Sequence, residues 1–286
     1  MRGATSERAS LRRVTNFARA WDDASVTIRA LVAAAAIASI AVAAQADEPA
    51  FSCFAHRGGI ARGVPENTLA ALRHALALGA RGVELDVRRS ADGALVVMHD
   101  DTVQRTTNGR GPVARLTLAQ LRALDAGNGE RVPTFAEALA LLAREGAAVL
   151  ADVKTRDVSL AELVRVADEH SASDALILGL RDLDALREAH ALMPRPHTLA
   201  FPKEARDAEP FARAGAAIVR LEPAWLRRDA QLARRVRALG AEVWALMGDA
   251  PREEIEEMKV LGVAGALTDR PELCGPLSSP TRATPP

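Results

Sequence analysis

From residue 51 onwards, short runs of aliphatic and β-branched residues alternate with longer stretches in which apolar positions recur every three or four residues. A short apolar run is typical of a buried strand, and the longer period is typical of an amphipathic helix. The pattern predicts strands at 51–56, 82–88, 148–154, 174–180, 196–201, 216–222, 241–247 and 262–268. It predicts helices near 67–79, 134–145, 159–170, 182–193, 204–214, 228–239 and 251–260.

Eight strands that alternate with helices over about 240 residues predict an α/β fold of the (β/α)8, or TIM-barrel, type. A doubly wound open sheet is the alternative. Three helix starts have local signals. Asn67 precedes the helical stretch "TLAAL", and Thr134 and Ser159 are each followed three residues later by a glutamate, which is the capping-box pattern.

Residues 91–133 interrupt this alternation with a small insertion after the second strand. Asp92-Gly93 is a hairpin signal, so "ALVVMHD" is expected to pair back onto the strand at 82–88. The rest of the insertion, about residues 100–132, is rich in Thr, Asn, Gly and Arg. Long insertions are often functional loops, and we expect this one to lie over the mouth of the barrel.

Both ends of the chain differ from the barrel in composition. Residues 1–29 are rich in arginine, and the uncharged stretch Ala30–Ala44 is too short for a membrane span of about 20 residues. It suits the core of a signal peptide at 1–46, cleaved after Ala46 in "AQA", with a buried Ala-rich helix or an uncleaved anchor as alternatives. The barrel domain would then span 47–274, and the Pro- and Ser-rich residues 275–286 would form a disordered tail.

The expected compartment and the composition limit the partners. A signal peptide implies export to the periplasm or secretion, where Cys53 and Cys274 either pair as a disulfide or remain two buried thiols. Lysine plus arginine equals aspartate plus glutamate at 37 each, and aromatic residues make up only 3%. This composition argues against nucleic acid as a partner. We expect a small-molecule substrate and no stable protein partner.

Polar residues occur where the expected strands end, which is the edge at which TIM-barrel active sites lie. They are His56, Arg57, Glu84, Asp86, His99, Asp100, Asp152 and Lys154. In the strand at 241–247, Trp244 either forms a substrate wall at the barrel mouth or fills the barrel core.

The carboxylates in this set indicate a metal site. Glu84 and Asp86 are two residues apart, so both face the same side of a strand, and Asp152 adds a third oxygen donor. Such donors suit one Mg²⁺ or Ca²⁺ per site, and zinc stays open because histidines lie nearby. The alternative is a buried network of ion pairs that joins these carboxylates to Arg57 and Lys154 without a metal.

The basic residues in the set indicate chemistry on an anionic ester. His56 and His99 can take and give protons near neutral pH. Arg57 offers a planar fork for phosphate, and Lys154 offers a point charge. Together with a divalent cation, these groups best match the cleavage of a phosphodiester.

Short motifs run in order along the chain: "AHRGG" and "PENT" at 55–68, "VELDV" at 83–87, "VVMHDDTVQRTTNGRG" at 96–111, "VPTFAEAL" at 132–139, "LADVK" at 150–154, "VW" at 243–244 and "LTDRP" at 267–271. Together they resemble the glycerophosphodiester phosphodiesterase family over the whole chain after residue 46. The resemblance implies a barrel with an insertion after strand two. It also implies hydrolysis of glycerophosphodiesters to an alcohol and glycerol 3-phosphate.

Matched motif by motif, the resemblance implies three pairs of roles: general acid and base for His56 and His99, metal ligands for Glu84 and Asp86, and phosphate binding for Arg57 and Lys154. In related enzymes the glycerol 2-hydroxyl is taken to attack phosphorus, and water then opens the cyclic phosphate. His56 would assist the nucleophile and His99 would protonate the departing alcohol, or the two roles would be reversed.

The chain departs from the family pattern at three places. Asp152 stands where glutamate is common, so the third carboxylate is one methylene shorter and metal preference can shift. "ALMG" at 245–248 and Ala264 replace polar residues near the ends of the last two strands. Two other functions therefore stay open: a phospholipase D acting on lysophospholipids or sphingolipids, and an exported protein that binds a phosphodiester without cleaving it.

Overall fold

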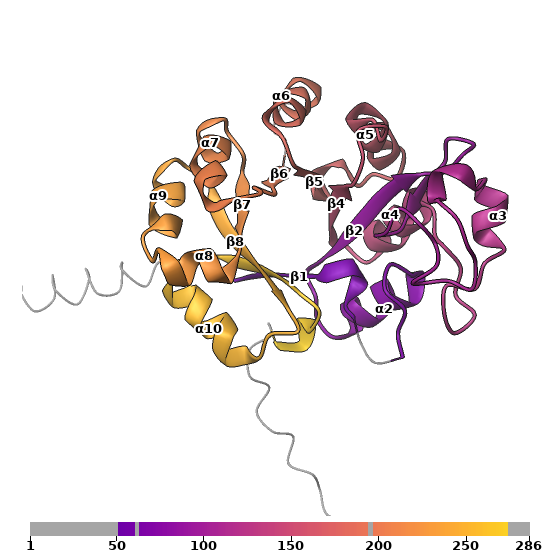
Figure 1. Cartoon of the computed structure of the whole chain (residues 1–286), viewed down its shortest axis with the longest axis horizontal. Coiled ribbons are helices and arrows are strands. Elements are labelled where there is room, and N and C mark those ends of the chain that lie inside the picture. Colours follow the sequence, from indigo (N-terminus) through magenta and orange to yellow (C-terminus); the bar gives the residue numbers. More distant parts are fainter. Residues whose placement is uncertain (1–50, 61–62, 194–196, 274–286) are drawn as a thin grey trace, which may run out of the picture. The chain divides into compact units, whose positions relative to one another are not determined.

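The computed structural model describes residues 51–60, 63–193 and 197–273. Within them a barrel of parallel strands is surrounded by helices (Figure 1). The barrel strands are β1 (Ser52–Ala55), β2 (Gly82–Arg89), β4 (Ala148–Val153), β5 (Leu176–Leu180), β6 (His197–Ala200), β7 (Ile218–Leu221), β8 (Glu242–Gly248) and β9 (Gly265–Thr268). Because β1 pairs with both β2 and β9, the barrel is closed. The predicted TIM barrel is confirmed, and the open-sheet alternative is wrong.

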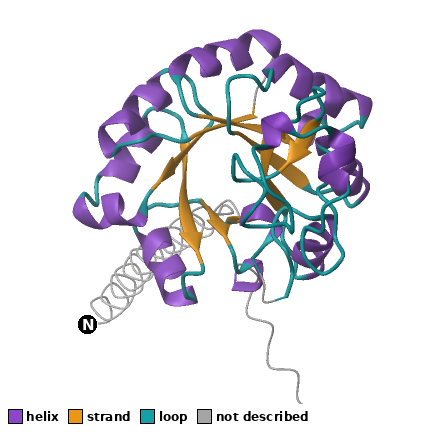
Figure 2. Cartoon of the chain, turned by 45° about the vertical axis from the view of Figure 1, so that its right-hand side comes forward, coloured by secondary structure: helices purple, strands orange, loops and turns teal. Residues whose placement is uncertain are grey.

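Helices follow the barrel strands and cover the outside of the barrel (Figure 2). They are α2 (Leu69–Ala77), α4 (Phe135–Arg144), α5 (Leu160–Glu169), α6 (Leu183–Leu192), α7 (Ala208–Arg213), α8 (Pro223–Arg228), α9 (Leu232–Ala238) and α10 (Arg252–Val260). Thr134 and Ser159 cap α4 and α5 as predicted, because their side chains accept backbone N–H groups of Glu137 and Glu162.

The N-cap of the first helix lies one residue later than predicted. Thr68, not Asn67, is the N-cap of α2, and its hydroxyl accepts the backbone N–H of Ala71. Asn67 has a left-handed backbone (φ 56°), which asparagine tolerates better than most residues. Its amide instead donates to Asp86 Oδ2 at 2.7 Å, so this residue supports the site rather than the helix end.

Two later helices also differ from the prediction. The segment expected at 204–214 begins with a 3-10 turn, Ala205–Asp207, before α7. The helix expected at 228–239 corresponds to α9, and an unpredicted helix, α8, precedes it; Asp229 leaves the helical conformation (φ −137°, ψ 88°) between the two. Pro223 at the start of α8 is the local signal for the additional helix, since proline is favoured in a first helical turn.

The insertion forms a small folded unit beside the barrel. Its strand β3 (Leu95–Val97) pairs antiparallel with β2, which confirms the predicted hairpin. A 3-10 turn (Val113–Arg115) and the short helix α3 (Leu118–Arg122) follow. Buried apolar side chains give this unit a core of its own: Val96, Met98, Val103, Val113, Leu121, Ala126 and Val132.

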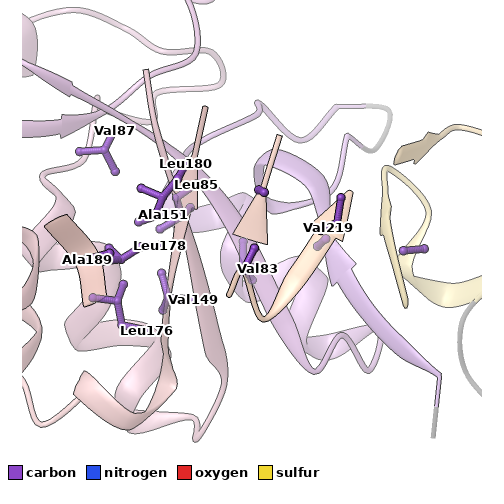
Figure 3. Packing of buried hydrophobic residues seen from close by; sticks show 14 of the residues in the cluster. Val83, Leu85, Val87, Val149, Ala151, Leu176, Leu178, Leu180, Ala189 and Val219 are labelled. Atoms are coloured by element: carbon purple, nitrogen blue, oxygen red, sulfur yellow. The ribbon is translucent and has the colours of Figure 1, made fainter. Parts of the chain in front are cut away.

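Two apolar layers hold the barrel together. The layer between the strands and the helices includes Val83, Leu85, Val149, Ala151 and Leu178 (Figure 3). A second layer fills the barrel interior and consists of Phe54, Leu150, Ile177, Leu199, Ile218, Trp244 and Leu267. Since successive strand residues alternate between these layers, the residue two positions after an interior apolar residue again faces the barrel interior.

Trp244 fills the core and does not form a substrate wall. Its side chain is 3% exposed, and its ring centroid lies 4.8 Å from that of Phe54. Its indole Nε1 donates to Glu242 Oε2 at 3.1 Å, at the end of β8 opposite the barrel mouth. Glycines make room for both rings: a Cβ atom at Gly82 would lie 2.4 Å from Phe54, and one at Gly265 would lie 2.6 Å from Trp244.

Cys53 is buried in β1 and is not a free thiol. Cys274, which the sequence offered as one possible disulfide partner, lies outside the described residues, as do the predicted signal peptide and C-terminal tail. In the described part of the chain, no helix is long and apolar enough to cross a membrane.

Candidate active site

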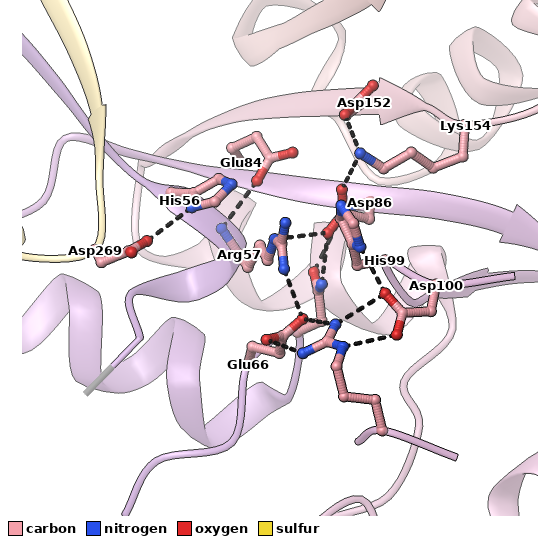
Figure 4. A network of polar contacts seen from close by, with 12 residues as sticks. His56, Arg57, Glu66, Glu84, Asp86, His99, Asp100, Asp152, Lys154 and Asp269 are labelled. Carbon is pink, nitrogen blue, oxygen red and sulfur yellow. Dashed lines mark hydrogen bonds and ion pairs between the residues drawn. The ribbon is translucent and has the colours of Figure 1, made fainter. Parts of the chain in front are cut away.

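The residues singled out in the sequence, apart from Trp244, meet at the carboxyl ends of the barrel strands (Figure 4). His56 and Arg57 follow β1 in a 3-10 turn, His56–Gly58. Glu84 and Asp86 lie on β2, and Asp152 ends the inward-facing row of β4 that contains Leu150. Lys154 comes directly after β4, and His99 follows β3.

Glu84, Asp86 and Asp152 form a buried acidic cluster. Each offers one carboxylate oxygen, and these atoms all lie within 4.8 Å of one another. All three residues are buried. Burial, followed by the nearby charges of Asp86 and Asp152, raises the pKa of Glu84 well above its usual range. Such a cluster is costly without a cation, so its geometry suits a bound metal ion.

The partners of the cluster leave one carboxylate oxygen without a hydrogen bond. Glu84 Oε2 accepts the backbone N–H of Arg57 at 2.9 Å. Lys154 Nζ lies 2.6 Å from Asp86 Oδ1, yet this buried oxygen accepts no well-directed hydrogen bond. The ion-pair network expected as the alternative is therefore present in part, but it leaves acceptor capacity on hard carboxylate oxygens. Carboxylate oxygens are the donors that Mg²⁺ and Ca²⁺ prefer.

In both histidines, the ring nitrogen Nδ1 lies within hydrogen-bonding distance of an aspartate. His56 Nδ1 lies 2.7 Å from Asp269 Oδ1, and His99 Nδ1 lies 2.7 Å from Asp100 Oδ1. An acceptor at Nδ1 fixes the ring and leaves Nε2 for a reacting group. Asp269 was missed from the sequence, although it directly follows the last barrel strand and belongs to the "LTDRP" motif.

Arg57 has a strained backbone that serves the acidic cluster. Its φ of 55° and ψ of 30° are left-handed, which costs a residue with a side chain about 1–2 kcal/mol. This conformation accompanies the hydrogen bond from its backbone N–H to Glu84. Its guanidinium contacts Glu66 Oε1 at 3.2 Å and lies 3.7 Å from Asp86 Oδ2, while its Nε is buried without a hydrogen bond.

Arg181, at the end of β5, is a second residue that the sequence analysis missed. It contacts both oxygens of Asp152, with Nη2 donating to Oδ2 at 2.6 Å, and lies 4.7 Å from the Phe201 ring. Burial works to raise the pKa of Asp152, but Arg181 and Lys154 outweigh it and lower this pKa. An arginine directly after an expected strand was the available signal.

A cavity of about 490 Å³ opens beside the cluster. Lys154 and Arg181, which contact the acidic residues, line this cavity together with Asp182, Glu188 and Lys203. The charged side chains in this lining suit a charged small molecule.

Acidic and basic side chains that converge at the strand ends of a TIM barrel are typical of an enzyme active site. Comparisons with known proteins identify the enzyme family. Residues 56–273 match the model of the glycerophosphoryl diester phosphodiesterase family. The chain belongs to this family, which confirms the expected enzyme class, a phosphoric diester hydrolase.

Individual relatives agree with this family. The chain is 33% identical over 242 residues to a glycerophosphodiester phosphodiesterase of Caldanaerobacter subterraneus, covering 76% of this chain and 93% of that one. The crystal structure of a glycerophosphodiester phosphodiesterase from Agrobacterium tumefaciens superposes with a TM-score of 0.68 at 30% identity, covering 78% of this chain and 98% of that one. An Oleispira antarctica phosphodiesterase in complex with the product sn-glycerol-3-phosphate superposes with a TM-score of 0.69 at 28% identity, covering 77% and 94%.

Proposed function

We propose that the protein hydrolyses glycerophosphodiesters to an alcohol and glycerol 3-phosphate, using His56 and His99 as acid and base and one divalent cation. The observation that carries this proposal is the pair of histidines, each with an aspartate on Nδ1, beside the buried acidic cluster. Family membership supports the reaction, and the relative from Oleispira antarctica with bound sn-glycerol-3-phosphate supports the product.

Glu84, Asp86 and Asp152 would hold the cation, and we propose Mg²⁺ or Ca²⁺. The cluster contains carboxylates alone, whereas zinc sites usually include histidine or cysteine. A divalent cation bound there would supply positive charge to the phosphate oxygens. Arg57 and Lys154 lie beside the same cluster and would hold the remaining phosphate oxygens.

The histidines would move two protons. His56 Nε2 would accept the proton of the attacking glycerol 2-hydroxyl as the O–P bond forms. His99 Nε2 would give its proton to the leaving oxygen as the other O–P bond breaks, so an alcohol departs rather than an alkoxide. Water then opens the cyclic phosphate with the two roles exchanged, which returns both histidines to their starting states.

The test is an add-back experiment on the metal-stripped enzyme. A panel of glycerophosphodiesters with choline, ethanolamine, glycerol and inositol groups is assayed with Mg²⁺, Ca²⁺ and Zn²⁺ restored in turn. We expect turnover to return with Mg²⁺ or Ca²⁺ and to be lost in His56→Ala and His99→Ala. Wild-type turnover by both variants in the presence of a chelator would refute the proposal.

One feature favours a second candidate, a phospholipase D acting on lysophospholipids. Ile60 and Leu78 are exposed by 42% and 38%, and both line a cavity of about 340 Å³ that also contacts Asp269. Exposed apolar side chains beside a site suit an acyl chain. Comparing turnover of a lysophospholipid with that of its deacylated headgroup separates the candidates, since the preferred proposal expects faster turnover of the deacylated compound.

A further inference from the structure

Arg105, which belongs to the insertion after β3, connects two carboxylates that come from different loops. Its guanidinium donates to Asp100 from Nε to Oδ2 (2.7 Å) and from Nη2 to Oδ1 (3.0 Å). It also donates to Glu66 from Nη1 to Oε2 (2.8 Å) and from Nη2 to Oε1 (2.7 Å). Four of its five N–H groups are therefore used in two bidentate contacts.

Each of these carboxylates contacts one residue of the proposed site (Figure 4). Asp100 lies 2.7 Å from His99 Nδ1, and Glu66 accepts from Arg57 Nη1 at 3.2 Å. Without the Arg105 guanidinium between them, Asp100 and Glu66 would repel each other, and Asp100 would turn away from His99. The hydrogen bonds from Arg105 also lower the pKa of Asp100, so this carboxylate stays ionised and can stabilise a protonated imidazole.

We propose that Arg105 is a positioning residue for the reaction: it holds Asp100 against His99, so that His99 presents its Nε2–H group to the leaving alcohol. This inference rests on the proposed function, because it takes His99 as the proton donor. It gives the insertion a role in catalysis, since the insertion supplies the arginine side chain that connects the loops containing Glu66 and Asp100.

The experiment compares two substrates that differ only in the leaving group. Glycerophosphocholine releases an alcohol that needs a proton, whereas glycerol 3-phospho-p-nitrophenol releases a stable phenolate that does not. We expect Arg105→Gln to lower kcat on glycerophosphocholine by about 10- to 100-fold, and on the nitrophenyl ester by less than about threefold. KM should change less than about threefold on both, because Arg105 would act through His99 and not through binding.

Three further variants make the result specific. Arg105→Lys should show a smaller loss than Arg105→Gln, because it keeps the positive charge, and some loss should remain because an ammonium cannot make both bidentate contacts. Arg110→Gln is the matched control, since Arg110 is an exposed arginine of the same insertion, and its kcat should stay within about twofold of wild type. Asp100→Asn keeps the size of the side chain and should reproduce the leaving-group difference. Circular dichroism melting confirms that each variant is folded.

The outcomes separate the inference from the proposed function. A leaving-group difference in His99→Ala without one in Arg105→Gln and Asp100→Asn overturns the inference and leaves His99 as the proton donor. Equal losses on both esters in Arg105→Gln overturn it as well. No difference in His99→Ala overturns the assignment of His99, and the inference falls with it.

Discussion

At the scale of single residues, neighbouring carboxylates of the acidic cluster behave in opposite ways. Burial and the charges of Asp86 and Asp152 raise the pKa of Glu84. Burial acts in the same direction on Asp152, but Arg181 and Lys154 lower its pKa instead. The cationic side chains pair with Asp86 and Asp152, and Glu84 is the carboxylate that gains most from an added cation.

Metal removal should therefore destabilise the protein. A ligand that binds only the folded state stabilises it by about 2.7 kcal/mol at 100 times its Kd, so adding Mg²⁺ or Ca²⁺ to stripped protein should raise the Tm. Glu84→Gln should abolish this rise, and Glu253→Gln, an exposed glutamate on α10, should not. Scanning calorimetry measures both. An equal rise in Glu84→Gln and wild type would exclude Glu84 as a ligand.

The contact between Asp269 and His56 Nδ1 should be needed for full turnover. Asp269→Asn replaces the acceptor at Nδ1 with a group that can also donate, so the ring is no longer fixed in one tautomer. We expect kcat to fall by about 10²- to 10⁴-fold, the range for loss of acid–base catalysis, with little change in Tm. Asp174→Asn, at an exposed aspartate before β5, is the control and should keep wild-type kinetics. A fall of less than about threefold in Asp269→Asn would show that His56 does not depend on this pair.

At the scale of elements, the apolar pattern predicted every barrel strand and the β2–β3 hairpin. These elements are set by local periodicity and by the Asp92-Gly93 turn, which need no knowledge of the fold. Helix α8 was not predicted, because it has only six residues and is too short to show a helical repeat of apolar positions. The position of Trp244 was left open, because either face of a strand can be apolar in a barrel.

Trp244 should affect stability and leave substrate binding unchanged. Trp244→Phe leaves a space against Phe54 and Gly265, and large-to-small core changes cost about 1–3 kcal/mol when part of a ring is lost. Urea denaturation should show this loss, and KM should stay within about twofold of wild type. Trp225→Phe, at a partly buried tryptophan of α8, is the control and should cost less. A raised KM with unchanged stability would show that Trp244 contacts the substrate, and would contradict its placement in the core.

At the scale of the whole molecule, the eight expected strands predicted a closed barrel. Closure of the barrel brings together residues that are distant in the sequence. His56 and Asp269 are 213 positions apart in the chain and become neighbours because β1 pairs with β9. Strand ends could be read from the sequence, and so could the histidines and the acidic cluster. The ion pairs of Arg105 and Arg181 could not, because they depend on how loops from different strands face each other.

Export is a prediction of the whole chain that rests on the sequence of residues 1–46. Expression with an intact N-terminus should place the protein outside the cytoplasm, and the mature chain should begin at Asp47. N-terminal sequencing of the exported protein gives the cleavage site. A chain that keeps residues 1–46 and stays in the cytoplasmic fraction would contradict the predicted signal peptide.

We propose that this barrel breaks the bond between phosphorus and the departing alcohol of a glycerophosphodiester, with His56, His99 and a divalent cation. Phosphorus-31 NMR of glycerophosphocholine incubated with the enzyme and Mg²⁺ or Ca²⁺ tests it most directly, because both possible products have their own signals. We predict that the substrate signal is replaced by that of glycerol 3-phosphate, and that this change is absent after chelation and in His56→Ala or His99→Ala. Formation of phosphocholine, or unchanged turnover after chelation, would refute this proposed reaction.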